Sequence, residues 1–276
     1  MTTITASTSR HLAWPRGYRP LLLDVLRSEW TKLRSVRSTY WSLLATTAAT
    51  IGLGAILCLF YINNFTTMSA ADRARFDPTG YALSGVMLAQ LAIGVLGVLV
   101  ITSEYATGMI RTSFAAVPQR RLVLAAKAMV FTAVTLVTGV VSCLVGFFLS
   151  QGILSSHHLQ TTIGAPGVLR AVIGGGLYLA VLGLLAFGIG AIVRHTAGAI
   201  AAIFGLVLVL PTMALFLPSS WSNSVSPYLP SNAGKAVFSV ASQPHTLAPW
   251  TGLAVFCAYA AASLLVAGFL VARRDA

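Results

Sequence analysis

Long apolar runs alternate with short polar segments along the chain. A helix needs roughly 20 apolar residues to cross a bilayer core, and it satisfies its own backbone hydrogen bonds within lipid. The runs therefore predict an all-α, polytopic membrane protein with six transmembrane helices. We place these spans at about 40–62, 81–102, 122–149, 170–193, 197–217 and 250–272.

The polar segment before the first span has two parts. Residues 1–19 are rich in Ser, Thr and Arg without periodicity, which predicts a disordered leader. Residues 20–38 are periodic at 100° per residue, which predicts an amphipathic interfacial helix on the membrane surface. We treat 20–276 as one six-span domain. The apolar face of the interfacial helix is expected to carry Leu22, Leu26, Leu33 and Val36.

Glu29 does not fit the apolar face near which it projects. It could pair with Lys32, three residues further on, or it could contact another subunit. We favour a solvated pair at the edge of the face. The residues that we assign to the interfacial helix as candidates for contacts are Arg27, Glu29, Trp30, Lys32 and Arg34.

Composition supports the membrane interpretation. Hydrophobic residues make up 57% of the 276 residues and charged residues only 9%, whereas a soluble domain carries about 25% charged residues. The net charge of +12 does not indicate nucleic-acid binding, because the basic residues flank the apolar runs. There they orient the protein and contact lipid headgroups.

The distribution of basic residues predicts the orientation. With both termini in the cytoplasm, the inner side holds fourteen of the 18 basic residues, which fits the positive-inside rule for a multi-pass protein of the cell membrane. The inner residues are Arg10, Arg16, Arg19, Arg27, Lys32, Arg34, Arg37, Arg111, Arg120, Arg121, Lys127, Arg194, Arg273 and Arg274. The outer ones are Arg73, Arg75, Arg170 and Lys235.

The sequence lacks the common motifs of catalysis. A GxxxxGK[ST] phosphate-binding loop is absent, since Gly234-Lys235 is followed by Ala236. Neither HExxH nor GxSxG occurs. The six acidic residues are scattered, which leaves little for acid–base chemistry. We therefore expect no enzymatic activity, no metal and no cofactor bound by this chain.

The predicted spans carry packing residues rather than charges. Glycines in the second and fourth spans, such as Gly97 and Gly183, allow close helix approach. Gln90 is the main polar residue deep in the second span; it either lines a pathway or hydrogen-bonds a neighbouring helix, and we favour the second. No Asp, Glu, Lys or Arg lies near a predicted midplane, which argues against a proton- or sodium-coupled transporter.

The segment after the second span reads SEYATGMIRTSFAAVPQRR over residues 103–121. Apolar residues lie between its charges, at Met109, Ile110 and Phe114, and a solvated loop would not need them. A brief helix with an apolar face could dock into a groove of a partner. The alternative is a loop that lies on the lipid headgroups.

This segment resembles the membrane (permease) subunits of type-two ABC exporters, especially those of high-GC Gram-positive bacteria (actinobacteria). Residues 28–41 (SEWTKLRSVRSTYW) resemble the lead-in of the same family, and residues 228–234 (YLPSNAG) resemble its loop before the last span. The resemblance covers about residues 20–276.

The resemblance implies a mechanism and partners. Permeases of this family form dimers, here a homodimer or heterodimer, with two ABC ATPase subunits that bind ATP and Mg²⁺. A coupling helix after span two seats in the ATPase, and short re-entrant helices, here within 218–249, gate the exit. The residues that would belong to the coupling region are Glu104, Tyr105, Gly108, Arg111, Pro118, Arg120 and Arg121.

The expected function is ATP-driven export of a hydrophobic or amphipathic substrate, such as a drug, a peptide antibiotic or a lipid, by alternating access. A non-transporting membrane scaffold or sensor is the alternative, because it would need the same spans but no ATPase.

Overall fold

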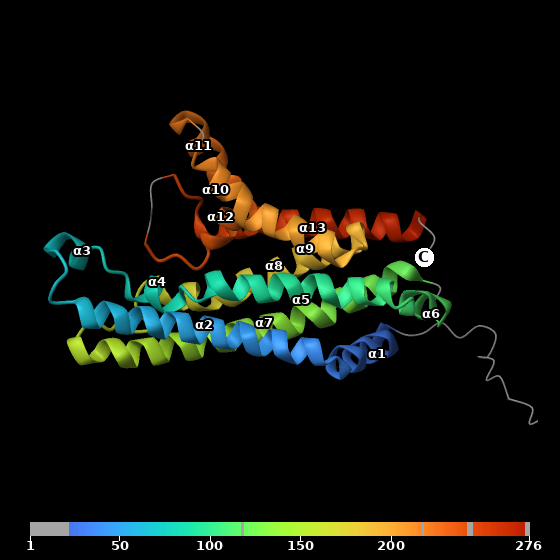
Figure 1. Ribbon diagram of the computed structural model, residues 1–276, viewed down its shortest axis with the longest axis horizontal. Coiled ribbons are helices and arrows are strands. Elements are labelled where there is room, and N and C mark those ends of the chain that lie inside the picture. The colour runs from blue at the N-terminus through green and yellow to red at the C-terminus, as the bar shows by residue number, and fades with distance from the viewer. Residues whose placement is uncertain (1–21, 117–118, 217, 242–244, 274–276) are drawn as a thin grey trace, which may run out of the picture.

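The computed structural model describes residues 22–116, 119–216, 218–241 and 245–273. Over these residues the fold is helical and contains no strand (Figure 1). The predicted leader, residues 1–19, and the candidate residue Pro118 lie outside the described residues.

Six helical segments are long and apolar enough to cross a membrane, which confirms the predicted fold class. The chain is a multi-pass membrane protein built from a bundle of these segments (Figure 1). They are α2 (Arg37–Asn64), α4 with α5 (Pro78–Leu83 and Val86–Ala106), α7 (Arg120–Leu154), α8 (Val168–Val193), α9 with α10 (Thr196–Phe204 and Leu210–Ala214) and α13 (Pro249–Arg273).

The fifth span is less regular than the others. A π-helical turn over Gly205–Val209 separates α9 from α10, whose second residue is Pro211. Proline has no N–H to donate to the preceding turn and crowds its carbonyls, so the normal ladder cannot continue there. The span ends at Ala214, earlier than the predicted residue 217.

Short helices lie at the two ends of the bundle (Figure 1). We name these ends after two of them. The α6 end carries α1 (Leu22–Ser35), α6 (Met109–Ala116) and the last residues of α13. The α3 end carries α3 (Ala70–Ala74) and, before the last span, α11 (Ser219–Val225) and α12 (Pro230–Lys235).

Helix α8 forms the centre of the bundle and packs against α5, α7 and α13. Close approach depends on glycine, as predicted: a Cβ at Gly97 of α5 would lie 2.5 Å from the carbonyl oxygen of Gly183 in α8. Gly94, in contrast, has ordinary space, since its nearest neighbour, Phe204, would be 3.6 Å away.

Candidate functional site

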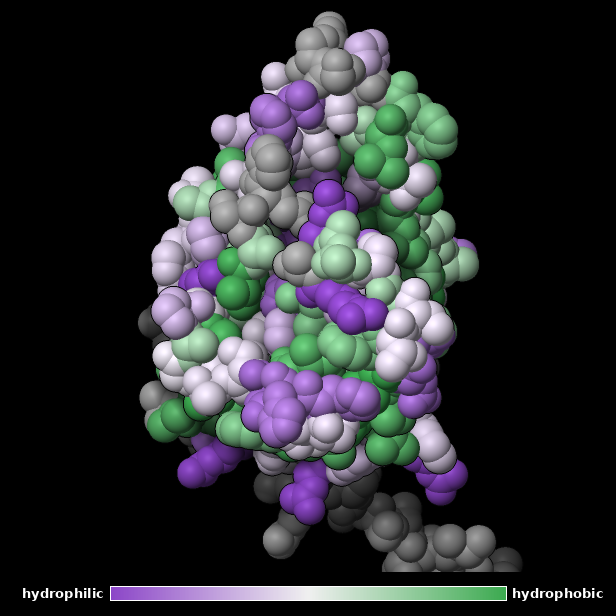
Figure 2. Space-filling model, turned by 90° about the vertical axis from the view of Figure 1, so that its left-hand side faces the viewer, coloured by the Kyte–Doolittle hydropathy of each residue, from purple (hydrophilic) through white to green (hydrophobic). Residues whose placement is uncertain are grey.

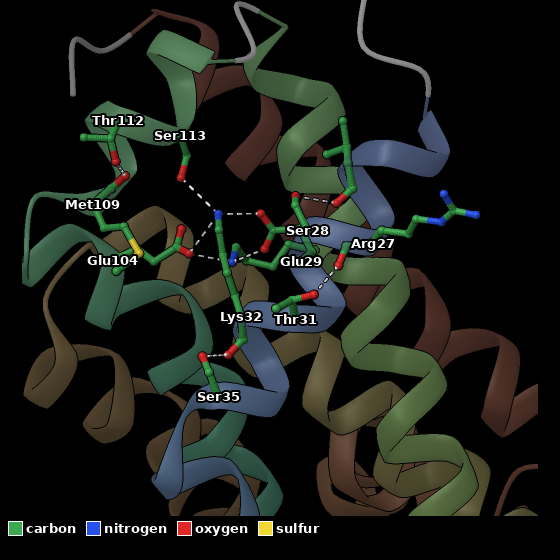
Figure 3. Close-up of polar contacts among 12 residues, drawn as sticks. Arg27, Ser28, Glu29, Thr31, Lys32, Ser35, Glu104, Met109, Thr112 and Ser113 are labelled. Carbon is green, nitrogen blue, oxygen red and sulfur yellow. Dashed lines mark hydrogen bonds and ion pairs between the residues drawn. The ribbon is translucent and has the colours of Figure 1, made fainter. Parts of the chain in front are cut away.

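Four charged side chains from three helices meet at the α6 end (Figure 3). Lys32 Nζ of α1 lies 2.8 Å from Glu29 Oε1 and 3.6 Å from Glu104 Oε1 of α5. Lys127 Nζ of α7 lies 2.8 Å from the same Glu104 oxygen and also pairs with Glu29 Oε2. Lys32 further donates a 3.0 Å hydrogen bond to the hydroxyl of Ser113 in α6. We call Glu29, Lys32, Glu104 and Lys127 the charge cluster.

Most of the charge cluster is shielded from solvent. The side chains of Glu29, Glu104 and Lys127 are 2%, 7% and 6% exposed, and only Lys32 reaches the surface, at 32%. Two acids and two lysines give no net charge, so each carboxylate has an ammonium to offset its lost hydration. Removing one of the three shielded side chains would leave an uncompensated buried charge, which typically costs about 3–5 kcal/mol. The four side chains therefore act as one unit.

The burial of Glu29 corrects the sequence prediction of a solvated pair. Its local partner Lys32 was expected, but the pairing with Lys127 was not. A buried carboxylate is tolerated here because ammonium groups approach it from two helices. The contact made by Glu29 is therefore within the chain rather than with solvent.

The predicted apolar face of the first helix is also partly wrong. The buried side chains of α1 are Val25, Glu29 and Leu33, spaced by four residues. Leu22 is exposed, and Val36 lies between α1 and α2, 46% exposed. Helix α1 packs on α7. The face of α1 that is buried is therefore the one that meets α7 and its Lys127, and not simply the most apolar face.

Helix α6 is held by one contact with the charge cluster and one with an apolar cluster beside it. Gly108 precedes it with φ +71°, a left-handed conformation in which glycine is unstrained. Ile110 is buried in one apolar cluster with Leu33 of α1 and Leu124 of α7, and Ser113 accepts the hydrogen bond of Lys32. Met109 is 46% exposed. The predicted brief helix is thus present, anchored through Ile110 and Ser113 and with Met109 exposed.

The other candidate residues do not belong to the charge cluster. Arg194 lies over the ring of Tyr105, with 4.9 Å from its Cζ to the ring centroid. Arg120 donates a 3.4 Å hydrogen bond to the carbonyl of Val271 in α13, and Arg121 is exposed. Arg111 belongs to α6. Of the candidate residues on α1, Arg27, Trp30 and Arg34 are exposed.

A cavity of about 240 Å³ adjoins the charge cluster. All four cluster residues line it, together with the start of α2 and apolar residues of α5 such as Leu96 and Val100. Glu104 Oε2 is buried, and no described residue donates a hydrogen bond to it. The cluster thus has space beside it and one unused acceptor.

Gln90 makes a second interhelical contact in the core. The Tyr178 hydroxyl of α8 donates a 2.5 Å hydrogen bond to Gln90 Oε1 of α5, and both side chains are buried. This geometry agrees with the favoured interpretation of Gln90 as a residue that joins two helices.

Lys127, Ser113 and Tyr178 were not among the sequence candidates. Lys127 gave a usable signal, because a lysine inside a predicted span needs a buried partner, and Glu29 and Glu104 are two of only six acidic residues in the chain. Ser113 and Tyr178 gave none.

No family model and no curated protein matches this chain. The functional interpretation therefore depends on the fold and on the geometry of the α6 end.

Proposed function

We propose that the chain is the permease subunit of an ATP-binding cassette exporter, driven by a separate ATPase polypeptide. The observation that carries this proposal is the attachment of α6: a short helix with an exposed Met109 is joined through Ser113 to a buried charge cluster that connects α1, α5 and α7. Such an element can receive a force at the surface and pass it into the bundle.

Force transmission follows from the pairing. A displacement of α6 moves the serine hydroxyl that holds Lys32, and Lys32 is held in turn by Glu29 and Glu104. Because separating buried opposite charges is costly, α1, α5 and α7 move with α6 rather than apart from it. Helix α5 packs tightly on the central α8 through Gly97, so the displacement reaches the core.

The adjoining cavity supports movement at this point. Its 240 Å³ next to Glu104 gives the paired side chains space to shift, and Glu104 Oε2 can accept an ammonium in a second arrangement. A packed element with two arrangements is what alternating access requires. ATP and Mg²⁺ bound by the partner would supply the energy; this chain supplies the α6 surface and the path inward.

The proposed orientation has the α6 end in the cytoplasm, in the cell membrane. Among the described residues, this end carries most of the basic side chains, as the positive-inside rule requires. The basic residues near the α3 end are Arg73, Arg75, Arg170 and Lys235.

Site-specific photocrosslinking tests the proposal. A photoreactive residue at Met109 in intact cells is expected to capture a protein that carries a GxxxxGK[ST] sequence, identified by mass spectrometry. The matched control is Asp72, an exposed residue of α3 at the opposite end, from which no such protein should be captured. Labelling of Met109 by an impermeant external reagent, or capture of the ATPase from Asp72 instead, would overturn the proposal. Failure of both sites to capture any nucleotide-hydrolysing protein would favour the scaffold or sensor.

A further inference from the structure

A second cavity lies at the α3 end, opposite the charge cluster. It measures about 980 Å³ and is lined by α4, the first turn of α8, α11, α12 and residues within 236–241 and 245–249. Figure 2 looks onto this end, where hydrophilic side chains are scattered over the middle of the face and hydrophobic ones gather along one flank. The volume is in the range of small-molecule binding sites, about 300–1,000 Å³.

Arg170 fixes one wall of this cavity. Its guanidinium donates hydrogen bonds to the carbonyl oxygens of Val237 at 2.9 Å and Ser239 at 3.0 Å, with a longer one of 3.4 Å to Ala236. The three carbonyls belong to the residues just after α12. Arg170 therefore holds the end of α12 and the segment that follows it against α8. Lys235, the last residue of α12, therefore has a fixed backbone position on the cavity wall.

Lys235 differs from the other charged groups that face the cavity. Arg170 is occupied by carbonyl oxygens, and the carboxylate of Asp77 accepts a 3.0 Å hydrogen bond from the backbone N–H of Thr79. Lys235 is half-buried, and no described residue accepts a hydrogen bond from its ammonium or pairs with it. Burial lowers the pKa of this lysine, which is the expected cost of a cation without a partner.

The other residues that line the cavity indicate which groups a bound anion would carry. Leu83, Met87 and Phe238 provide an apolar wall. The Ser226 hydroxyl accepts from the Asn232 amide at 2.9 Å, so its own proton can be donated into the cavity. A ligand suited to these groups combines an anionic head with an apolar body.

We propose that the α3-end cavity binds an anionic amphiphile, with its charged head on Lys235 and its apolar part against Leu83, Met87 and Phe238. The ligand is either a membrane lipid with an anionic headgroup or a free amphiphile, because both present this chemistry. Binding at this site does not require the chain to be an exporter subunit.

Binding to the purified full-length chain in phosphatidylcholine nanodiscs tests this proposal. The probe is radiolabelled decane-1-sulfonate, compared with decyltrimethylammonium, which has the same chain and the opposite charge. We expect saturable binding of the sulfonate and none of the ammonium. Lys235→Gln should weaken sulfonate binding about tenfold or more, as for loss of a hydrogen bond to a charged group, and Lys235→Arg should retain it within about threefold.

Arg75→Gln is the matched control, since it removes an exposed cation at the same end but outside the cavity, and it should bind the sulfonate as the unmodified chain does. Equal binding of the two probes, or unchanged sulfonate binding in Lys235→Gln, would overturn the proposal. Nanodiscs that contain phosphatidylglycerol identify the source of the ligand. Competition by that lipid supports the site with a lipid as occupant, and saturable binding without competition supports it with a free amphiphile.

Discussion

Replacing Lys127 with methionine removes the ammonium that bridges Glu29 and Glu104 but keeps a side chain of similar length. The two carboxylates, 2% and 7% exposed, then share only Lys32, so the cluster holds one uncompensated buried negative charge. Removal of one partner from a buried ion pair costs about 3–5 kcal/mol. We expect the free energy of unfolding of Lys127→Met to fall by this amount.

Two further variants separate charge imbalance from lost packing. Lys127→Met combined with Glu104→Gln leaves the neutral pair of Glu29 and Lys32, and it should recover about 0.5–3 kcal/mol, the usual coupling within one ion-pair network. Lys32→Met leaves the same charge imbalance, but solvent reaches the position of this ammonium, which is 32% exposed. Because solvent screens the Lys32 pairs and can hydrate the carboxylates from that side, the loss should be about 1 kcal/mol.

Equilibrium unfolding in mixed dodecyl maltoside and dodecyl sulfate micelles, followed by circular dichroism, measures all three variants. The reasoning is refuted if Lys127→Met and Lys32→Met destabilise equally. It is also refuted if the double variant is no more stable than Lys127→Met alone, because the cost would then come from packing rather than from charge.

Three other outcomes are expected. Gly97→Ala should lower the free energy of unfolding by about 1–3 kcal/mol, since the new Cβ would lie 2.5 Å from a backbone oxygen. Gly52→Ala is the control, because a Cβ at Gly52 has nothing within 4 Å. Similar losses in both variants would contradict the close packing of α5 on α8. Tyr178→Phe should lower the free energy of unfolding by about 1–3 kcal/mol, because the buried Gln90 oxygen loses its donor. The double variant Tyr178→Phe with Gln90→Leu should lose less than the sum of the two single variants. Additive losses in the unfolding assay would argue against the hydrogen bond. Sulfonate binding at the α3-end cavity should weaken as pH rises through the pKa of Lys235, and burial places this loss at a lower pH than for an exposed lysine. Nanodisc binding measured above about pH 8, where histidine is neutral, checks it, and a flat profile in the unmodified chain would exclude Lys235 as the anion's partner.

The spans could be predicted from sequence because they depend on local composition. A run of apolar residues meets the requirement of the bilayer wherever the other helices lie, and the starts of α7 and α13 are within two residues of the predicted positions. Gly108 is named only through the resemblance; the structure places it before α6 with φ +71°, where glycine is unstrained.

The charge cluster could not be predicted in the same way. Lys127 is 98 positions from Glu29 and 23 from Glu104 along the chain, and only the packing of α1 on α7 brings them together. The periodicity of α1 predicted that its leucine and valine side chains face lipid. A periodicity uses only the residues of the helix itself and takes no account of the helices that pack against it. The structure turns Val25 and Glu29 inward, since an ammonium on the neighbouring helix stabilises a carboxylate there.

The low exposure of the charge cluster has a practical consequence for biochemistry at the α6 end. Dissolved ions largely screen exposed charges that lie more than about 10 Å apart at 0.1 M salt, and over shorter distances at higher salt, but they act much less on pairs that water does not reach. Concentrated salt should therefore strip a protein that docks electrostatically on the exposed arginines of α1, such as Arg27 and Arg34, while the connection from α6 to α5 and α7 stays intact. If the proposed ATPase docks there, a salt wash followed by its readdition would rebuild that complex on an undamaged chain.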